Sequence, residues 1–197
     1  MRALRSRVRL VSLLSLVAVL ASVAWVAYRH WRDRPPFSVS AVHATATVRF
    51  TEWSRFEQDA RAIGAEDLGA RPAGRPDDRL FVGRLEHRTP TGAGDQDVFH
   101  VLVVDKRNER FAGVGNLTQG PPSYLAGLSQ RYPWLPAPRG AEDGQAWSVA
   151  VPANRPGPIS FAGGLPASQG LTEADLMVVL VLVGQDGTAY WAARVSG

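Results

Sequence analysis

The chain of 197 residues has no cysteine, 45% hydrophobic residues and 20% charged residues. The lack of cysteine excludes a disulfide framework, a zinc–thiolate site, a cysteine nucleophile and an N-terminal lipid-modified cysteine. The balance of apolar and charged residues excludes a disordered chain, and the presence of only one long apolar stretch excludes a polytopic membrane protein.

The net charge of +4 is unevenly distributed along the chain. Residues 1–34 contain seven of the 22 basic residues and one of the 18 acidic residues, which leaves 15 bases and 17 acids in the rest. That remainder therefore carries a net charge of −2 and gives no support to a nucleic-acid-binding surface. No nucleic-acid partner is expected.

Residues 10–28 form an uncharged, apolar segment between two basic flanks. As a helix, the segment would rise about 28 Å, close to the thickness of a hydrocarbon core. A retained signal anchor is favoured over a cleaved signal peptide, because the apolar core continues beyond the small residues at which cleavage would occur. The residues expected to flank the anchor are Arg2, Arg5, Arg7, Arg9, Trp25, Tyr28, Arg29, Trp31, Arg32 and Arg34.

This interpretation divides the chain into four parts. They are a short basic cytoplasmic tail (1–9), a transmembrane helix (10–28), a basic and proline-rich spacer (29–36) and an extracytoplasmic β domain (37–197). The small excess of arginine before the apolar segment predicts a cytoplasmic N-terminus. The expected location is the cell membrane, with a single pass and the C-terminal domain outside.

After the spacer, residues 37–50 alternate in polarity and predict one or two half-buried strands. Residues 54–64 predict a short helix, with Ser54 and Glu57 as a capping box and Gly64 at its end. The apolar stripe of this helix consists of Phe56, Ala60 and Ile63.

Two pairs of later segments are predicted to form hairpins. Residues 80–89 and 97–105 are strand-like and are joined by a polar loop. Residues 176–183 and 188–195 flank a Gly-Gln-Asp-Gly turn, and the first of them is apolar on both faces. A strand of that kind must be covered on both sides.

The segment between these hairpins is less regular. Residues 123–132 predict a short helix within a proline-rich stretch, and residues 146–152 and 159–162 predict short strands. About seven strands and one or two short helices together favour an immunoglobulin-like β-sandwich. The alternative is an α+β fold, with a mixed sheet and a helix on one face.

The pattern resembles membrane-anchored actinobacterial proteins with an immunoglobulin-like extracytoplasmic β domain, whose function is uncharacterised. The resemblance is carried by the arginine-rich start, VLVVD at 101–105, VPA at 151–153 and the closing VLVLVGQDGTAYWAARV. It implies a binding or assembly module and supplies no active-site residues.

No catalytic sequence motif is present. If Leu85 lay opposite Leu102 in the first hairpin, His87 and His100 would be cross-strand neighbours, close enough to share a metal ion. A shift of one residue would place the two histidines on opposite faces, and no third ligand is identified. No cofactor is expected.

Tyr124, Tyr132 and Trp134 lie among prolines and form a candidate binding ledge, since aromatic and proline-rich loops bind peptides and sugars. These residues would otherwise close the end of a sandwich core. The expected function is a non-catalytic binding or assembly module of a bacterial cell envelope. Its expected partners are the lipid bilayer and another membrane or cell-wall-associated protein, and the alternative is an enzyme or metal-binding domain at the His87/His100 face.

Overall fold

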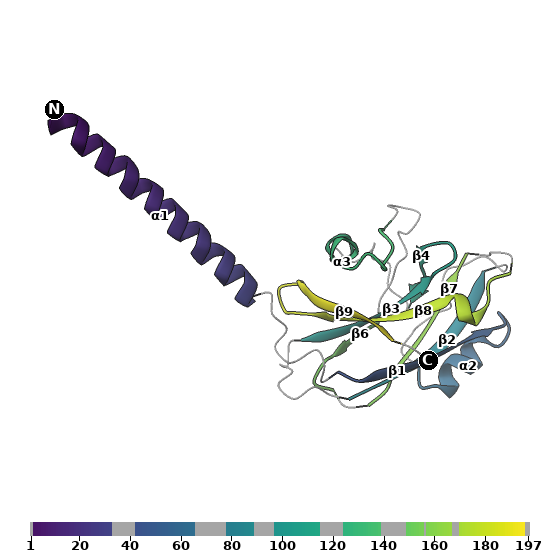
Figure 1. Cartoon of the computed structure of the whole chain (residues 1–197). Helices are drawn as coiled ribbons and strands as arrows, with labels where there is room; N and C mark the ends of the chain where they lie inside the picture. Colours follow the sequence, from purple (N-terminus) through teal and green to yellow (C-terminus); the bar gives the residue numbers. More distant parts are fainter. Residues whose placement is uncertain are drawn as a thin grey trace. The chain divides into compact units, whose positions relative to one another are not determined.

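The computed structural model describes residues 2–32, 42–65, 78–88, 97–114, 124–138, 149–155, 157–166 and 170–195 (Figure 1). The side chains of residues 2–14, 32, 113 and 114 are not part of this description. The chain divides into two compact units, Met1–Arg34 and Pro35–Gly197. Residues 33–36 of the predicted spacer lie outside the described residues.

The first unit contains helix α1, Arg2–Arg32. Among the described residues, no helix is long and apolar enough to cross a membrane. This finding overturns the predicted transmembrane helix over residues 10–28, and with it the predicted single-pass location at the cell membrane.

The second unit is mainly β and is built from two antiparallel sheets (Figure 1). Sheet A has the order β1-β2-β7-β5, with bounds Ala44–Thr51, Arg79–His87, Ile159–Leu165 and Gly113–Val114. Sheet B has the order β4-β3-β8-β9, with bounds Arg110–Phe111, Val98–Asp105, Leu176–Val183 and Ala189–Val195. Strand β6, Val149–Pro152, pairs with the other end of the same edge of β3.

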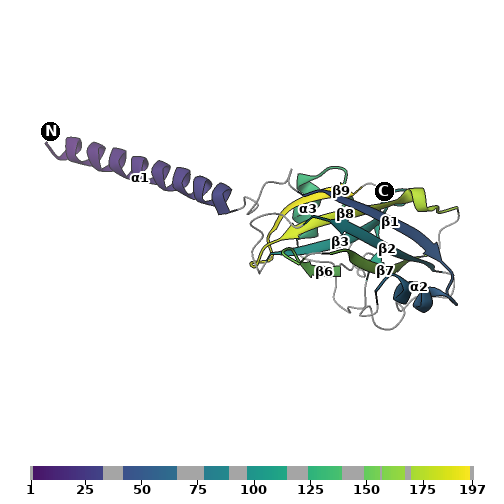
Figure 2. The same ribbon diagram turned by 90° about the horizontal axis from the view of Figure 1, so that it is seen from below.

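The strand order defines how the chain is wound. When β1, β2, β3, β5, β7, β8 and β9 are lettered A to G, sheet A reads ABED and sheet B reads CFG. This is the order of immunoglobulin-type sandwiches, here with β4 and β6 added beside strand C. In Figure 2, strands β1, β2 and β7 of sheet A run side by side.

The predicted hairpin between residues 80–89 and 97–105 is wrong, because these segments belong to different sheets. Strand β2 pairs with β1 and β7, whereas β3 pairs with β8 along its whole length. The pairing of β2 with β7 has a physical basis in Gly83, which lies opposite Phe161 and leaves space for its ring. Bulky aromatic rings commonly cover glycines in this way.

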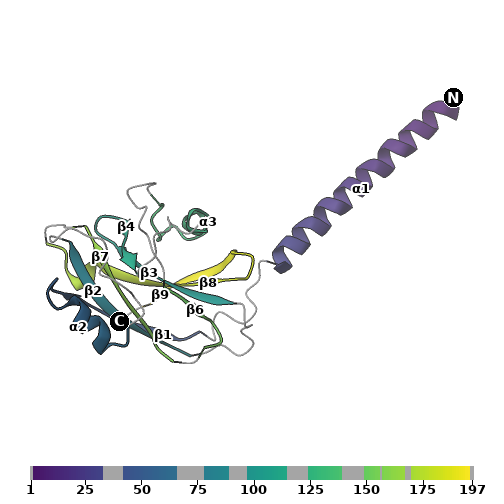
Figure 3. The ribbon, with the colours of Figure 1, turned by 180° about the vertical axis from the view of Figure 1, so that it is seen from behind.

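The core lies between the sheets, and each outer face is covered by a helix (Figures 1 and 3). Helix α2, Phe56–Ala62, packs on sheet A, and helix α3, Leu125–Arg131, packs on sheet B. Strand β8 is thus buried on both faces, as its sequence predicted. The C-terminal hairpin of β8 and β9 is also confirmed.

Helix α2 differs at its start from the sequence prediction. The residue before its first turn is Arg55, and no side chain caps the helix, so the predicted capping box of Ser54 and Glu57 is wrong. The helix is instead tied to β1 through Asp59, which accepts hydrogen bonds from Thr51 and Arg49. Gly64 adopts the left-handed conformation with φ of 76°, as predicted.

Candidate functional site

His87 and His100 do not share a face. The ring of His87 packs against Phe99, 5.2 Å between centroids, on the inner side of sheet B. His100 points to the outer side of the same sheet, where its Nδ1 lies 2.7 Å from the hydroxyl of Tyr124 on the segment leading into α3. Burial lowers the pKa of His87, and it lowers the pKa of His100 to about 4.

The separation of the histidines follows from the sheet assignment. The prediction assumed that His87 and His100 lie on neighbouring strands of one sheet, but β2 and β3 lie in opposite sheets, and the two imidazoles lie on opposite sides of sheet B. Within the described residues, no group of three or more His, Cys, Asp or Glu side chains is placed to hold a metal ion. The predicted His87/His100 face is therefore not formed.

The three residues of the predicted aromatic ledge, Tyr124, Tyr132 and Trp134, are half-buried and pack against the same core cluster, but they differ in their further contacts. Tyr124 bonds to His100 and lines a cavity of about 310 Å³ between α3 and the β8–β9 turn. Tyr132 packs on the core, with its ring 5.5 Å from that of Trp134. Only Trp134 of the three lines a separate cavity over the outer face of sheet B.

The residues predicted to flank an anchor belong to α1 and the segment that follows it. The rings of Trp25 and Tyr28 lie 6.2 Å apart and those of Tyr28 and Trp31 6.5 Å apart, and all three side chains are exposed. Arg29 is exposed as well. The remaining members lie outside the described side chains: Arg2, Arg5, Arg7, Arg9, Arg32 and Arg34.

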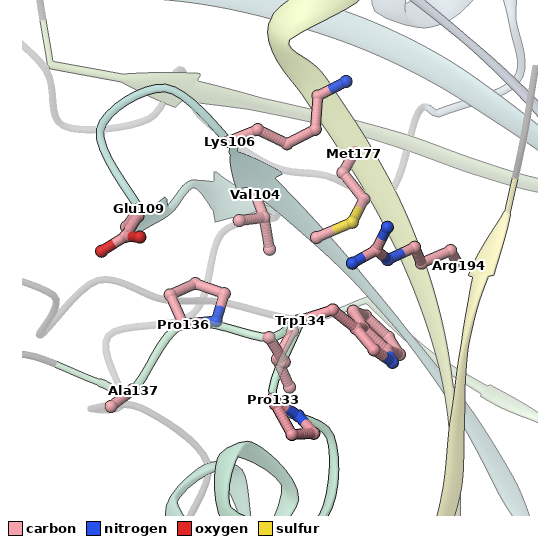
Figure 4. A pocket seen from close by; sticks show the side chains of 10 residues that line it. Val104, Lys106, Glu109, Pro133, Trp134, Pro136, Ala137, Met177 and Arg194 are labelled. Atoms are coloured by element: carbon pink, nitrogen blue, oxygen red, sulfur yellow. The ribbon is translucent and has the colours of Figure 1, made fainter.

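The cavity at Trp134, which we call the Trp134 pocket, has a volume of about 430 Å³. One wall is the outer face of sheet B, with Val104, Met177 and Arg194 from three different strands. The other wall is the proline-rich segment after α3, residues 133–137. Figure 4 shows Trp134 and Arg194 on the same side of the pocket, and the Arg194 guanidinium carbon lies 4.8 Å from the Trp134 ring centroid.

The wall that carries Trp134 is fixed by the burial of Leu135 and by two hydrogen bonds. Leu135 is buried, and its backbone N–H donates to the carbonyl of Tyr132 at 2.9 Å. The hydroxyl of Ser129 in α3 donates to the carbonyl of Pro136 at 2.8 Å. These contacts fix the backbone on both sides of Trp134.

A second cavity, of about 520 Å³, adjoins the Trp134 pocket, and we call it the edge groove. It lies between strand β1 of sheet A and the ends of β8 and β9, beside the short 3₁₀ helix η4, Glu173–Asp175. Lys106, Met177 and Arg194 line both cavities. In Figure 4 the ammonium end of Lys106 points away from Trp134. The two cavities thus share part of their lining, and we treat them together as the candidate site.

The charged groups of this site differ in whether they already have partners. Glu173 accepts a hydrogen bond from the backbone N–H of Phe50 at 2.8 Å. Hydrogen bonds from Thr172 hold the pKa of Asp175 below its usual value, and the charge of Lys106 adds to this effect. Among the described residues, neither Lys106 nor Arg194 has a carboxylate within ion-pair distance.

The sequence pointed to Trp134 but missed Lys106, Met177 and Arg194. Lys106 is the only lysine of the chain, and Arg194 is the exposed position of an otherwise half-buried strand, so a weak signal existed for each. These residues come together only on the outer face of the folded sheet B, and no local sequence pattern shows that they will do so. Comparisons with protein-family models, curated proteins and solved structures gave no match.

Proposed function

We propose that the second unit is a non-catalytic binding or assembly module that holds a partner protein at the Trp134 pocket. The observation that carries this proposal is the contact of Trp134 with Arg194 at the wall of a preformed cavity. Tryptophan and arginine dominate the binding energy of protein interfaces, and methionine is also enriched there. The pocket combines all three residue types.

The dimensions of the pocket suit a side-chain anchor. A volume of about 430 Å³ is within the range of ligand-binding cavities and exceeds what one large side chain fills. Met177 adapts its shape to different apolar groups, while Trp134 and the prolines form a stiff wall. This arrangement favours an apolar or aromatic side chain of the partner, inserted beside Arg194.

Selection of random short peptides on the immobilised full-length protein tests this proposal. Selected peptides are expected to bind the wild-type chain, and Trp134→Ala is expected to weaken binding by about 2 kcal/mol or more, roughly 30-fold. Fluorescence anisotropy with labelled peptide measures the loss. Trp31→Ala, which removes an exposed tryptophan of α1, is the matched control.

Two outcomes would count against a binding module at this site. The first is the failure of any peptide to be enriched over an uncoated surface. The second is equal binding to the wild type, Trp134→Ala and Trp31→Ala. Circular dichroism of the Trp134→Ala chain must match that of the wild type, so that a folding defect is not taken for lost binding.

A further inference from the structure

Among the described strands, β1 pairs with β2 alone, so its other edge is unpaired and lies in the edge groove. Its ladder with β2 continues at His43, whose carbonyl accepts from the backbone N–H of Arg88 at 3.1 Å. In an antiparallel pair, the backbone groups of successive residues point alternately toward the partner and away from it. The backbone N–H and C=O groups of the odd-numbered residues of β1 therefore point toward β2, and those of the even-numbered residues point toward the open edge.

The hydrogen bond at Phe50 supports this assignment. The N–H of Phe50 donates to the Glu173 side chain, so it points away from β2 as an even-numbered residue should. Ala46 and Val48 have the same orientation and line the edge groove. In the described part of the chain, no backbone hydrogen bond beyond the strand ladders reaches either residue.

The edge of β1 is thus covered at one end and open in the groove. Glu173 supplies the acceptor that a neighbouring strand would otherwise provide to Phe50. Side chains of this kind commonly protect an exposed edge from unwanted pairing. At Ala46 and Val48, the donors and acceptors have the spacing that an added extended segment requires.

Positive charge lies beside this open edge. Lys106 and Arg194 both line the edge groove, and neither is paired with a carboxylate among the described residues. The backbone of Lys106 is fixed to η4, because its N–H donates to the carbonyl of Asp175 at 2.9 Å. A carboxylate entering the groove would meet the guanidinium of Arg194, which lies against Trp134, and the ammonium of Lys106, whose backbone is fixed.

We propose that the site binds an extended segment of a partner protein that carries an acidic side chain. The segment adds as a strand to the edge of β1, with backbone hydrogen bonds to Ala46 and Val48. Its carboxylate is bound by Lys106 and Arg194, and a following apolar side chain enters the Trp134 pocket. This inference rests on the proposed function and specifies the chemistry of the partner.

Amide hydrogen exchange, followed by NMR with the tightest peptide from the selection, tests the strand addition. The amides of Ala46 and Val48 are expected to exchange quickly in the free full-length protein and to become protected when the peptide binds. The amide of Thr47 is the internal control, since it faces β2 and is protected in both states.

Two substitutions test the charge contact in the same binding assay. Lys106→Gln is expected to weaken the binding of the peptide about tenfold, because a charge-assisted hydrogen bond is lost. The same loss is expected when the acidic residue of the peptide is replaced by its amide. Arg155→Gln, at an exposed position outside both cavities, should leave affinity unchanged.

The outcomes separate this inference from the proposed function. If a peptide binds and depends on Trp134, but leaves the Ala46 and Val48 amides unprotected, the strand addition is wrong and the binding module stands. If no peptide binds, the proposed function fails as well. Protection of the Ala46 and Val48 amides in the free protein would overturn the inference. Protection that does not depend on protein concentration would show that another part of the same chain occupies the groove. Protection that rises with protein concentration would show that a second copy of the chain occupies it.

Discussion

At the scale of single residues, the ring of Phe161 packs closely on Gly83. A Cβ atom added at Gly83 would overlap the Phe161 ring and would lie 2.9 Å from the backbone oxygen of Thr47. The ring is fully buried and has no space to withdraw. Gly83→Ala is therefore expected to destabilise the protein by about 1–3 kcal/mol.

Gly127 provides the control for this substitution. It lies in the middle of α3, and a Cβ atom there would meet nothing within 4 Å. Gly127→Ala is expected to be neutral or to stabilise the chain by about 0.5–1 kcal/mol, because alanine favours helix. Urea unfolding of both variants measures the difference. Equal stability of Gly83→Ala and the wild type would show that sheet A is packed differently at β7.

His100 couples the stability of the fold to pH. Burial lowers its pKa to about 4, whereas an unfolded histidine has a pKa near 6.5. Between these values the unfolded chain binds a proton that the folded chain does not, so stability falls as the pH decreases from about 6.5 to about 4. The contribution is fully present above pH 6.5 and amounts to at most about 3.4 kcal/mol.

Urea unfolding at pH 7 and at pH 4.5 measures this effect. His100→Phe is expected to lose less stability on acidification than the wild type, because the titrating group has been removed. His87 shifts in the same direction and is present in both chains, so the comparison isolates His100. An identical pH dependence in the two chains would show that the His100 imidazole titrates normally in the fold.

At the scale of elements, the sequence located most strands but did not identify all of their partners. The alternation in 80–89 and 97–105 is a local signal, and both became strands. Their partners were set by distant segments, since β7 supplies Phe161 for Gly83 and β8 supplies a strand buried on both faces. The C-terminal hairpin was predictable because its turn is short and contains Gly187 in the left-handed conformation.

The candidate site shows the same division between local and distant signals. Trp134 stood out because of the prolines around it. Of the three residues that complete the site, Lys106 lies in the turn after β3, Met177 on β8 and Arg194 on β9. They meet only when sheet B has formed and α3 covers part of its outer face. No spacing along the chain encodes that meeting.

Strand β8 is the element on which the domain most depends. Val181 is fully buried on its outer face, among side chains of α3 and β9. An aspartate there would place an unpaired carboxylate in an apolar environment. Val181→Asp is expected to cost at least about 4 kcal/mol, a large part of the stability of a domain of this size.

Thermal unfolding of the full chain checks this expectation. A loss of about 4 kcal/mol corresponds to a decrease of about 10 °C in Tm. Thr47→Asp is the matched control, since Thr47 is exposed on β1 opposite Arg84 and its replacement should change Tm by about 2 °C or less. If the Val181→Asp chain had the same Tm as the wild type, β8 would lie at the periphery of the domain and not in its core.

At the scale of the whole molecule, the domain is a stack of four layers, namely α2, sheet A, sheet B and α3. Three groups of buried residues fill the spaces between successive layers. Sheet B is apolar on both faces and takes part in two of these groups, whereas sheet A exposes part of its outer face. The candidate site lies where the edge of this stack is open, between β1 and β9.

All members of these three groups belong to the second unit. A shortened chain that begins at residue 35 should therefore fold and retain the unfolding free energy of the full chain within about 0.5 kcal/mol, as expected for a change outside the core. Its far-UV circular dichroism spectrum should lose the helical signal of α1 and be dominated by β structure. Urea unfolding of the full and shortened chains, with the tryptophan fluorescence of the domain as probe, makes the comparison. A decrease of several kcal/mol in the shortened chain would show that the first unit stabilises the sandwich, and the layers described above would then be an incomplete account of the core.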